Sequence, residues 1–178
     1  MKMTRYLFLM FAVTTLFSAG TYAQAKKPVK RPATTARNTA TLPPLDVRAA
    51  RVKVSNQLTN VSLFTAKLGP IAQAIEALDS EAKIKRVNTQ SVDQNTKNKQ
   101  RVIDSIRSLR EGIVKLESEF RVKPALKKYY VTIQGISDLA GQAETSAIAG
   151  KFVAANAPLR TLQQKLNDTL TAMPNAEL

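Results

Sequence analysis

The sequence predicts an all-α fold, an antiparallel up-down-up-down four-helix bundle with a long, kinked first helix. Apolar residues recur at intervals of three and four in four segments between residues 46 and 173, and this spacing places side chains on one face of a helix. Proline, glycine and short polar stretches separate the segments. No segment of useful length alternates apolar and polar residues as a strand does. An extended helical coiled coil is the alternative, because sustained heptads satisfy both architectures.

The N-terminal residues 1–23 predict a secretory signal peptide. Lys2 and Arg5 precede an almost wholly apolar run over residues 6–17, and small residues follow. This is the order of regions in a signal peptide. The run is shorter than the roughly 20 apolar residues of a membrane-spanning helix, so a cleaved signal is favoured over a retained anchor. Cleavage is expected after Ala23, with Ala25 as the alternative. The sequence therefore predicts an exported bacterial protein, periplasmic or secreted, with no transmembrane span after signal removal.

Residues 24–45 are predicted to be a disordered basic linker rich in proline, alanine and threonine. They contain four of the eight prolines of the chain and five cations without an acid. Such a segment cannot bury enough apolar surface to offset the entropy of ordering it. Its cations form a candidate envelope-contact tail: Lys26, Lys27, Lys30, Arg31 and Arg37. The linker leads into a single helical bundle domain, residues 46–178.

The first helix is predicted over residues 46–86. Apolar residues recur every seven positions at Val47, Val54, Val61, Leu68 and Ile75. Further apolar residues, among them Ile71, lie at intermediate positions. Gly69-Pro70 interrupts the segment, because proline lacks a backbone donor and disfavours helix at the preceding residue. The apolar stripe nevertheless stays in phase across the interruption. One long kinked helix is therefore favoured over two helices joined by a tight turn.

The second helix is predicted to begin within the polar stretch 88–98. Ser91 and Gln94 have the spacing of a capping box, in which the two side chains satisfy free amides at a helix start. The stripe that follows is regular: Val102, Ile106, Leu109, Ile113, Leu116 and Phe120. It is expected to end near Val122, before Pro124, which suits the first turn of the next helix.

The third helix is predicted to run from Pro124 to a left-handed cap at Gly150. Its stripe is Leu126, Tyr129, Ile133, Ile136, Ala140, Ala143 and Ala147. Gly135 lies inside it at an expected cost of ~1 kcal/mol relative to alanine. A fourth helix is predicted from about Phe152 to Met173, with Leu159, Leu162, Leu166 and Leu170 facing inward and a kink at Pro158.

Composition excludes most classes of catalytic site. After residue 23 the chain contains no Cys, His or Trp, and its one methionine is Met173. Thiolate and imidazole metal ligands, Ser-His-Asp catalysis and covalent c-type haem attachment are thus impossible. Carboxylates remain, but several lie four residues before a cation, the arrangement of surface pairs on a solvated helix: Asp79–Lys83, Glu81–Lys85, Glu111–Lys115 and Glu117–Arg121;. A non-enzymatic protein without cofactor or metal is expected.

Charge supplies the one candidate binding feature. The chain after residue 23 has 25 basic and 13 acidic residues, and such an excess attracts anionic surfaces. Four cations surround a predicted turn and form a candidate anion-contact patch: Arg121, Lys123, Lys127 and Lys128. Tyr129 and Tyr130 adjoin them, and core packing is favoured over ligand binding for these rings.

Two functions from different classes follow from this sequence. The first is an exported interaction or structural protein of the cell envelope, which contacts anionic envelope components or another protein. The second is a periplasmic chaperone or ligand-binding module for an apolar client. No nucleic-acid partner is expected outside the cytoplasm. The sequence leaves the oligomeric state and the specific partner open.

Overall fold

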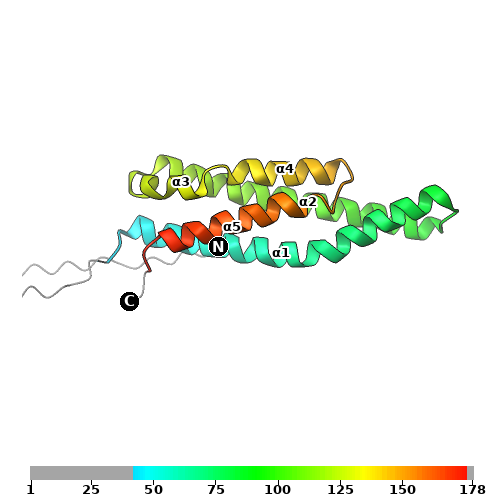
Figure 1. Ribbon diagram of the computed structural model, residues 1–178, viewed down its shortest axis with the longest axis horizontal. Coiled ribbons are helices and arrows are strands. Elements are labelled where there is room, and N and C mark those ends of the chain that lie inside the picture. The colour runs from blue at the N-terminus through cyan, green and yellow to red at the C-terminus, as the bar shows by residue number, and fades with distance from the viewer. Residues whose placement is uncertain (1–41, 176–178) are drawn as a thin grey trace, which may run out of the picture. The chain divides into compact units, whose positions relative to one another are not determined.

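A computed structural model describes residues 42–175, and within them every regular element is a helix. These are α1 (Leu45–Ile84), α2 (Thr89–Val122), the 3-10 helix η1 (Pro124–Tyr129), α3 (Tyr130–Ile133), α4 (Ile136–Ile148) and α5 (Asn156–Ala172) (Figure 1). The predicted all-α class is confirmed. The predicted signal peptide, and the linker up to residue 41, lie outside the described residues.

Helix α1 is continuous through Pro70, so the prediction of one long helix is confirmed. A proline inside a helix removes one hydrogen bond to the preceding turn, and Figure 1 shows that the axis of α1 bends. The five heptad positions are all buried. Ile71 differs, because 42% of its side chain is exposed. The heptad series therefore predicted the buried face of α1, whereas the intermediate position Ile71 is exposed.

Helix α2 begins at Thr89, earlier than the predicted capping box. Asn88 is its N-cap, and the Asn88 side chain accepts a hydrogen bond from the amide of Gln90 at 3.0 Å. The capping box at Ser91 was therefore wrong: asparagine is an equally good cap, and it stands three residues earlier in the chain. The predicted end at Val122 is confirmed, and the stripe of α2 faces the core.

The third helix was predicted to be continuous, and this prediction is wrong. Its predicted buried face is confirmed. Three pieces, η1, α3 and α4, replace it, and the break falls at Gln134 and Gly135. Gly135 has φ 84°, a left-handed conformation that glycine adopts without steric cost;. The predicted stripe is buried on both sides of the break. The apolar spacing therefore predicted the buried face correctly, but it did not predict the break in the backbone.

Helix α5 begins at Asn156, four residues later than predicted. Phe152 lies before the helix and is buried, and Gly150 has the predicted left-handed conformation with φ 75°. Pro158 does not kink α5, because it lies in the first turn, where its missing amide would have no intrahelical partner;.

The helices pack around two buried clusters of side chains. Helix α1 contacts α2 and α5, and α4 contacts the same two helices. One cluster lies near η1 and contains Phe120, Leu126 and Leu166; the other contains Leu68, Ile106 and Phe152. The backbone amide of Val153, in the α4–α5 connection, donates to the carboxylate of Glu76 at 2.8 Å. Beyond this level, α1 and α2 continue side by side as a projecting hairpin (Figure 1).

Candidate functional site

Two of the four carboxylates that sequence spacing assigned to surface pairs, Asp79 and Glu117, have other partners. Of the four predicted pairs, Glu81–Lys85 is present. Asp79 instead lies 2.6 Å from the ammonium of Lys99 and accepts a hydrogen bond from Asn95 at 2.9 Å. Spacing along one helix could not reveal these partners, because both are on the neighbouring helix.

Glu117 is the largest departure from the predicted solvated face, since only 4% of it is exposed. Its two carboxylate oxygens accept hydrogen bonds from the backbone amides of Gly135, at 2.6 Å, and Ser137, at 2.9 Å. Burial acts to raise the pKa of Glu117. The hydroxyl of Ser137, the two amides and the charge of Arg121 outweigh it, so the pKa lies below its usual value. Glu117 thus satisfies free amides at the start of α4, where a negative charge is favourable.

Glu144 is a second buried carboxylate, and its partners are two arginines of α2. It accepts hydrogen bonds from Arg110 at 2.7 Å and from Arg107 at 3.0 Å. The hydrogen bond from Arg110 is the main reason that the pKa of Glu144 is lowered, although burial opposes it. The sequence did not lead us to predict this ion-paired cluster. Two arginines three residues apart lie on one face of α2, and this spacing could have indicated a buried acidic partner. Within residues 42–175, no cluster of acids could hold a metal ion.

The four predicted patch residues divide into three exposed cations and one paired cation. Arg121, Lys127 and Lys128 are exposed, and we call these three the η1 cation cluster. The guanidinium of Arg121 lies 5.9 Å from the centre of the Tyr130 ring, and the ammonium of Lys128 lies 4.8 Å from that of Tyr129. Both are within the range of cation–π attraction. Tyr129 is buried, as predicted.

Lys123 does not belong with the exposed cluster, because two carboxylates hold its ammonium. The distances are 2.7 Å to Glu119 and 3.1 Å to Asp46. The bond to Glu119, and then the bond to Asp46, raises the pKa of Lys123 above its usual value. Glu119 also accepts a hydrogen bond from the ammonium of Lys53 at 2.7 Å. Burial acts to raise the pKa of Glu119, but these two ammonium groups outweigh it and lower the pKa.

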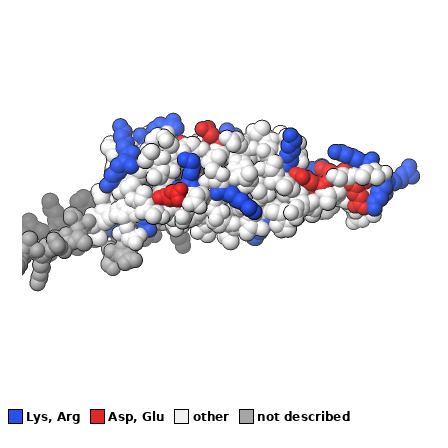
Figure 2. All heavy atoms as spheres, in the orientation of Figure 1, with Lys and Arg blue, Asp and Glu red and all other residues white. Residues whose placement is uncertain are grey.

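The end of the bundle around η1 has a positive excess. Residues 42–53 and 117–130 together contain seven Lys and Arg and three acids. Figure 2 shows cationic side chains gathered at this end, and mixed signs at the opposite tip. Arg51 is engaged here, since its guanidinium donates to the carbonyl oxygens of Leu170 and Met173 at the end of α5. No ion pair of the described residues uses a member of the η1 cation cluster.

The described part of the chain begins at the η1 end of the bundle. Asp46 of α1 contacts Lys123, so the chain enters α1 beside η1. The five predicted tail cations, Lys26, Lys27, Lys30, Arg31 and Arg37, lie outside the described residues.

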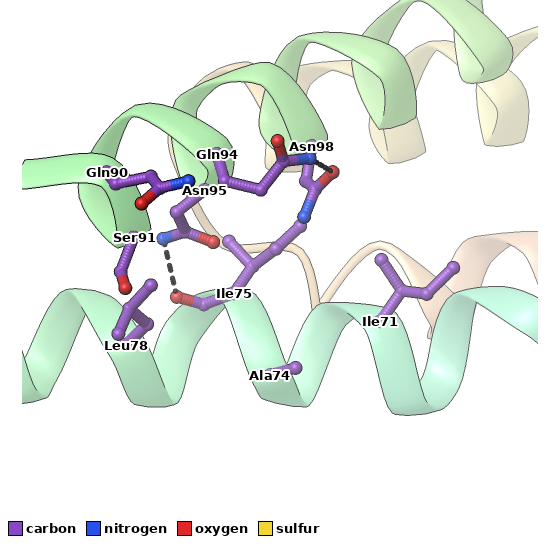
Figure 3. A pocket seen from close by; sticks show the side chains of 9 residues that line it. All are labelled: Ile71, Ala74, Ile75, Leu78, Gln90, Ser91, Gln94, Asn95 and Asn98. Carbon is purple, nitrogen blue, oxygen red and sulfur yellow. Dashed lines mark hydrogen bonds between the residues drawn. The ribbon is translucent and has the colours of Figure 1, made fainter.

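A shallow groove on the projecting hairpin is a second candidate site (Figure 3). Its α1 side is aliphatic and its α2 side is mainly amide; the lining residues are Ile71, Ala74, Ile75, Leu78, Gln90, Ser91, Gln94, Asn95 and Asn98. Asn95 donates to the carbonyl oxygen of Ile75 at 3.2 Å, and Gln94 donates to the side chain of Asn98 at 3.1 Å. The exposed Ile71 contributes an aliphatic surface that is open to a ligand.

Comparisons with known proteins add no relative to this description. No protein-family model matches the chain, and neither the curated proteins nor the solved structures contain a significant match to it. In residues 42–175, none of the helices combines the length and apolar character that crossing a bilayer requires.

Proposed function

We propose that this is an exported, non-enzymatic helical-bundle protein that contacts anionic components of the cell envelope. The observation that supports this function most directly is the η1 cation cluster. Arg121, Lys127 and Lys128 are exposed, while neighbouring Lys53 and Lys123 are paired with carboxylates. Exposed cations that form no ion pair among residues 42–175 are available to an anionic partner, and their attraction falls as salt rises. The tail cations extend the same positive charge along the chain.

An antiparallel four-helix bundle in up-down-up-down order is the architecture that we propose for residues 46–178. The contacts among α1, α2, α4 and α5 support it, because each of these helices packs against its two neighbours in a ring;. In this arrangement η1, α3 and α4 together replace the third helix.

The environments of the carboxylates support a non-enzymatic role. Glu117 and Glu144 are buried against donors that lower their pKa values, whereas a general acid or base needs a pKa near the working pH. Both groups stabilise contacts between helices.

Sedimentation with envelope fractions tests the proposed contact. The chain from Gln24 is compared with a variant in which the five tail cations are replaced by glutamine. We expect the unmodified chain to sediment with the fractions at low salt and to be released as salt rises, and the variant to bind more weakly. Binding that neither salt nor the replacement changes would contradict the proposal.

A chaperone or ligand-binding module for an apolar client is the alternative function, and the hairpin groove favours it. Its aliphatic side includes Ile71, which is exposed although it belongs to the apolar stripe of α1. In this case the protein should suppress aggregation of an apolar client even at high salt, and Ile71→Ser should weaken the effect. Leu63→Ser, on an exposed part of α1 outside the groove, is the control.

A further inference from the structure

We propose that the η1 end docks on an anionic lipid bilayer, with aliphatic side chains entering the headgroup region between the cations. This inference rests on the proposed function and names its partner. It begins from three apolar side chains that the fold leaves in water. Leu45 is 73% exposed, Val122 is 71% exposed and Val131 is 65% exposed.

These aliphatic side chains lie among the charges of the η1 end. Val122 stands between Arg121 and Lys123 in the chain. Val131 follows Tyr130, whose ring lies under the guanidinium of Arg121. Leu45 precedes Asp46, which accepts a hydrogen bond from Lys123 at 3.1 Å. These contacts bring the ends of α2, α3 and α1 to one part of the surface.

A bilayer interface matches this mixture better than a purely aqueous polyanion. Cations attract the anionic headgroups, and a tyrosine ring has an apolar body and a polar tip that suit the interface. Exposed aliphatic groups gain free energy when they leave water, and salt does not remove that gain. A soluble polyanion offers no apolar phase, so it would use the cations alone. Docking of this kind is reversible, because the apolar area is small.

Vesicle binding of the chain from Gln24 tests this inference. The probes are vesicles of phosphatidylcholine with phosphatidylglycerol, vesicles of phosphatidylcholine alone, and polyphosphate as a soluble polyanion. The test variant is Val122→Ser with Val131→Ser. The matched control is Leu63→Ser with Ile148→Ser, because these residues are 58% and 60% exposed on other parts of the bundle. Thermal unfolding by circular dichroism checks that each variant is folded.

The expected result is binding to the anionic vesicles that the test variant weakens about tenfold, with a small change in the control. Polyphosphate binding should be equal in all variants. Val122→Leu with Val131→Leu should strengthen vesicle binding, which gives a readout that unfolding cannot imitate. Equal vesicle binding by the serine variant and the unmodified chain would overturn the inference.

Three further outcomes bear on this inference and on the proposed function. Binding to polyphosphate without binding to anionic vesicles would overturn the bilayer as partner and leave an anionic envelope contact standing. Binding to none of the probes would overturn both. Equal binding to vesicles with and without phosphatidylglycerol would also overturn the inference, since charge complementarity would then have no part.

Discussion

The carboxylate of Glu117 joins two parts of the chain that lie eighteen residues apart. Its oxygens accept hydrogen bonds from the backbone amides of Gly135 and Ser137, so it holds α2 against the start of α4. Sequence spacing paired Glu117 with Arg121, four residues on. Arg121 does contribute to the lowered pKa of Glu117, but its guanidinium lies over the ring of Tyr130. A rule about neighbours on one helix could not include amides that only the folded chain brings near.

Replacing Glu117 by glutamine should lower the free energy of unfolding by about 1–3 kcal/mol at neutral pH. A glutamine side chain offers one acceptor, so its amide group would face a backbone amide that has lost its partner. Urea denaturation measures the change. Glu111→Gln is the control, because Glu111 is exposed on the same helix. An equal effect of the two replacements would contradict the structural role of Glu117.

The same carboxylate should make stability depend on pH. Because the folded pKa of Glu117 lies below its unfolded value, its contribution is present above the unfolded pKa and is lost as pH falls through the folded pKa. The difference in stability between the unmodified chain and Glu117→Gln should therefore shrink from about pH 5 downward. Urea denaturation at several acidic pH values checks this. A difference that stays constant to strongly acidic pH would argue against it.

At the scale of the helices, apolar spacing predicted burial better than it predicted boundaries. The stripe from Leu126 to Ala147 is buried as expected, yet the backbone breaks at Gly135. Glu117, which lies on another helix, accepts hydrogen bonds from backbone amides at the break, and no local pattern contains that contact. At the candidate site, Arg121, Lys127 and Lys128 are exposed at one end of the bundle. Lys123 is paired with Glu119, four residues earlier on α2, and with Asp46, which is distant in sequence.

Two glycines that look alike in the sequence should respond oppositely to alanine. Gly141 lies inside α4, and an added methyl group would meet the side chain of Arg110 at 3.9 Å, an ordinary contact distance. Gly141→Ala should therefore stabilise the protein by about 1 kcal/mol. Gly135 has φ 84°, so Gly135→Ala should destabilise it by about 1–2 kcal/mol. Thermal unfolding of both variants provides the test, and shifts of the same sign would refute the assignment of the break.

At the scale of the whole described bundle, the two ends differ in charge. The η1 end has seven cations and three acids, whereas residues 73–100 of the projecting hairpin have five cations and four acids. The chain also enters α1 at the η1 end. The positive excess is therefore concentrated at the η1 end. The proposed envelope contact requires the cations at this end to contribute more to binding than cations elsewhere in the bundle.

The most direct test of this claim compares two variants that remove the same number of charges from opposite ends. One replaces Arg121, Lys127 and Lys128 by glutamine; the other replaces Lys83, Arg86 and Lys97, which are exposed on the hairpin and belong to no ion pair of the described residues. Binding of each to anionic envelope fractions is measured at low salt. The η1 variant should bind about a hundredfold more weakly, since each cation near an anionic surface contributes ~1 kcal/mol, and the hairpin variant should change little. Equal weakening of the two variants would contradict the account, because total charge would then explain the binding.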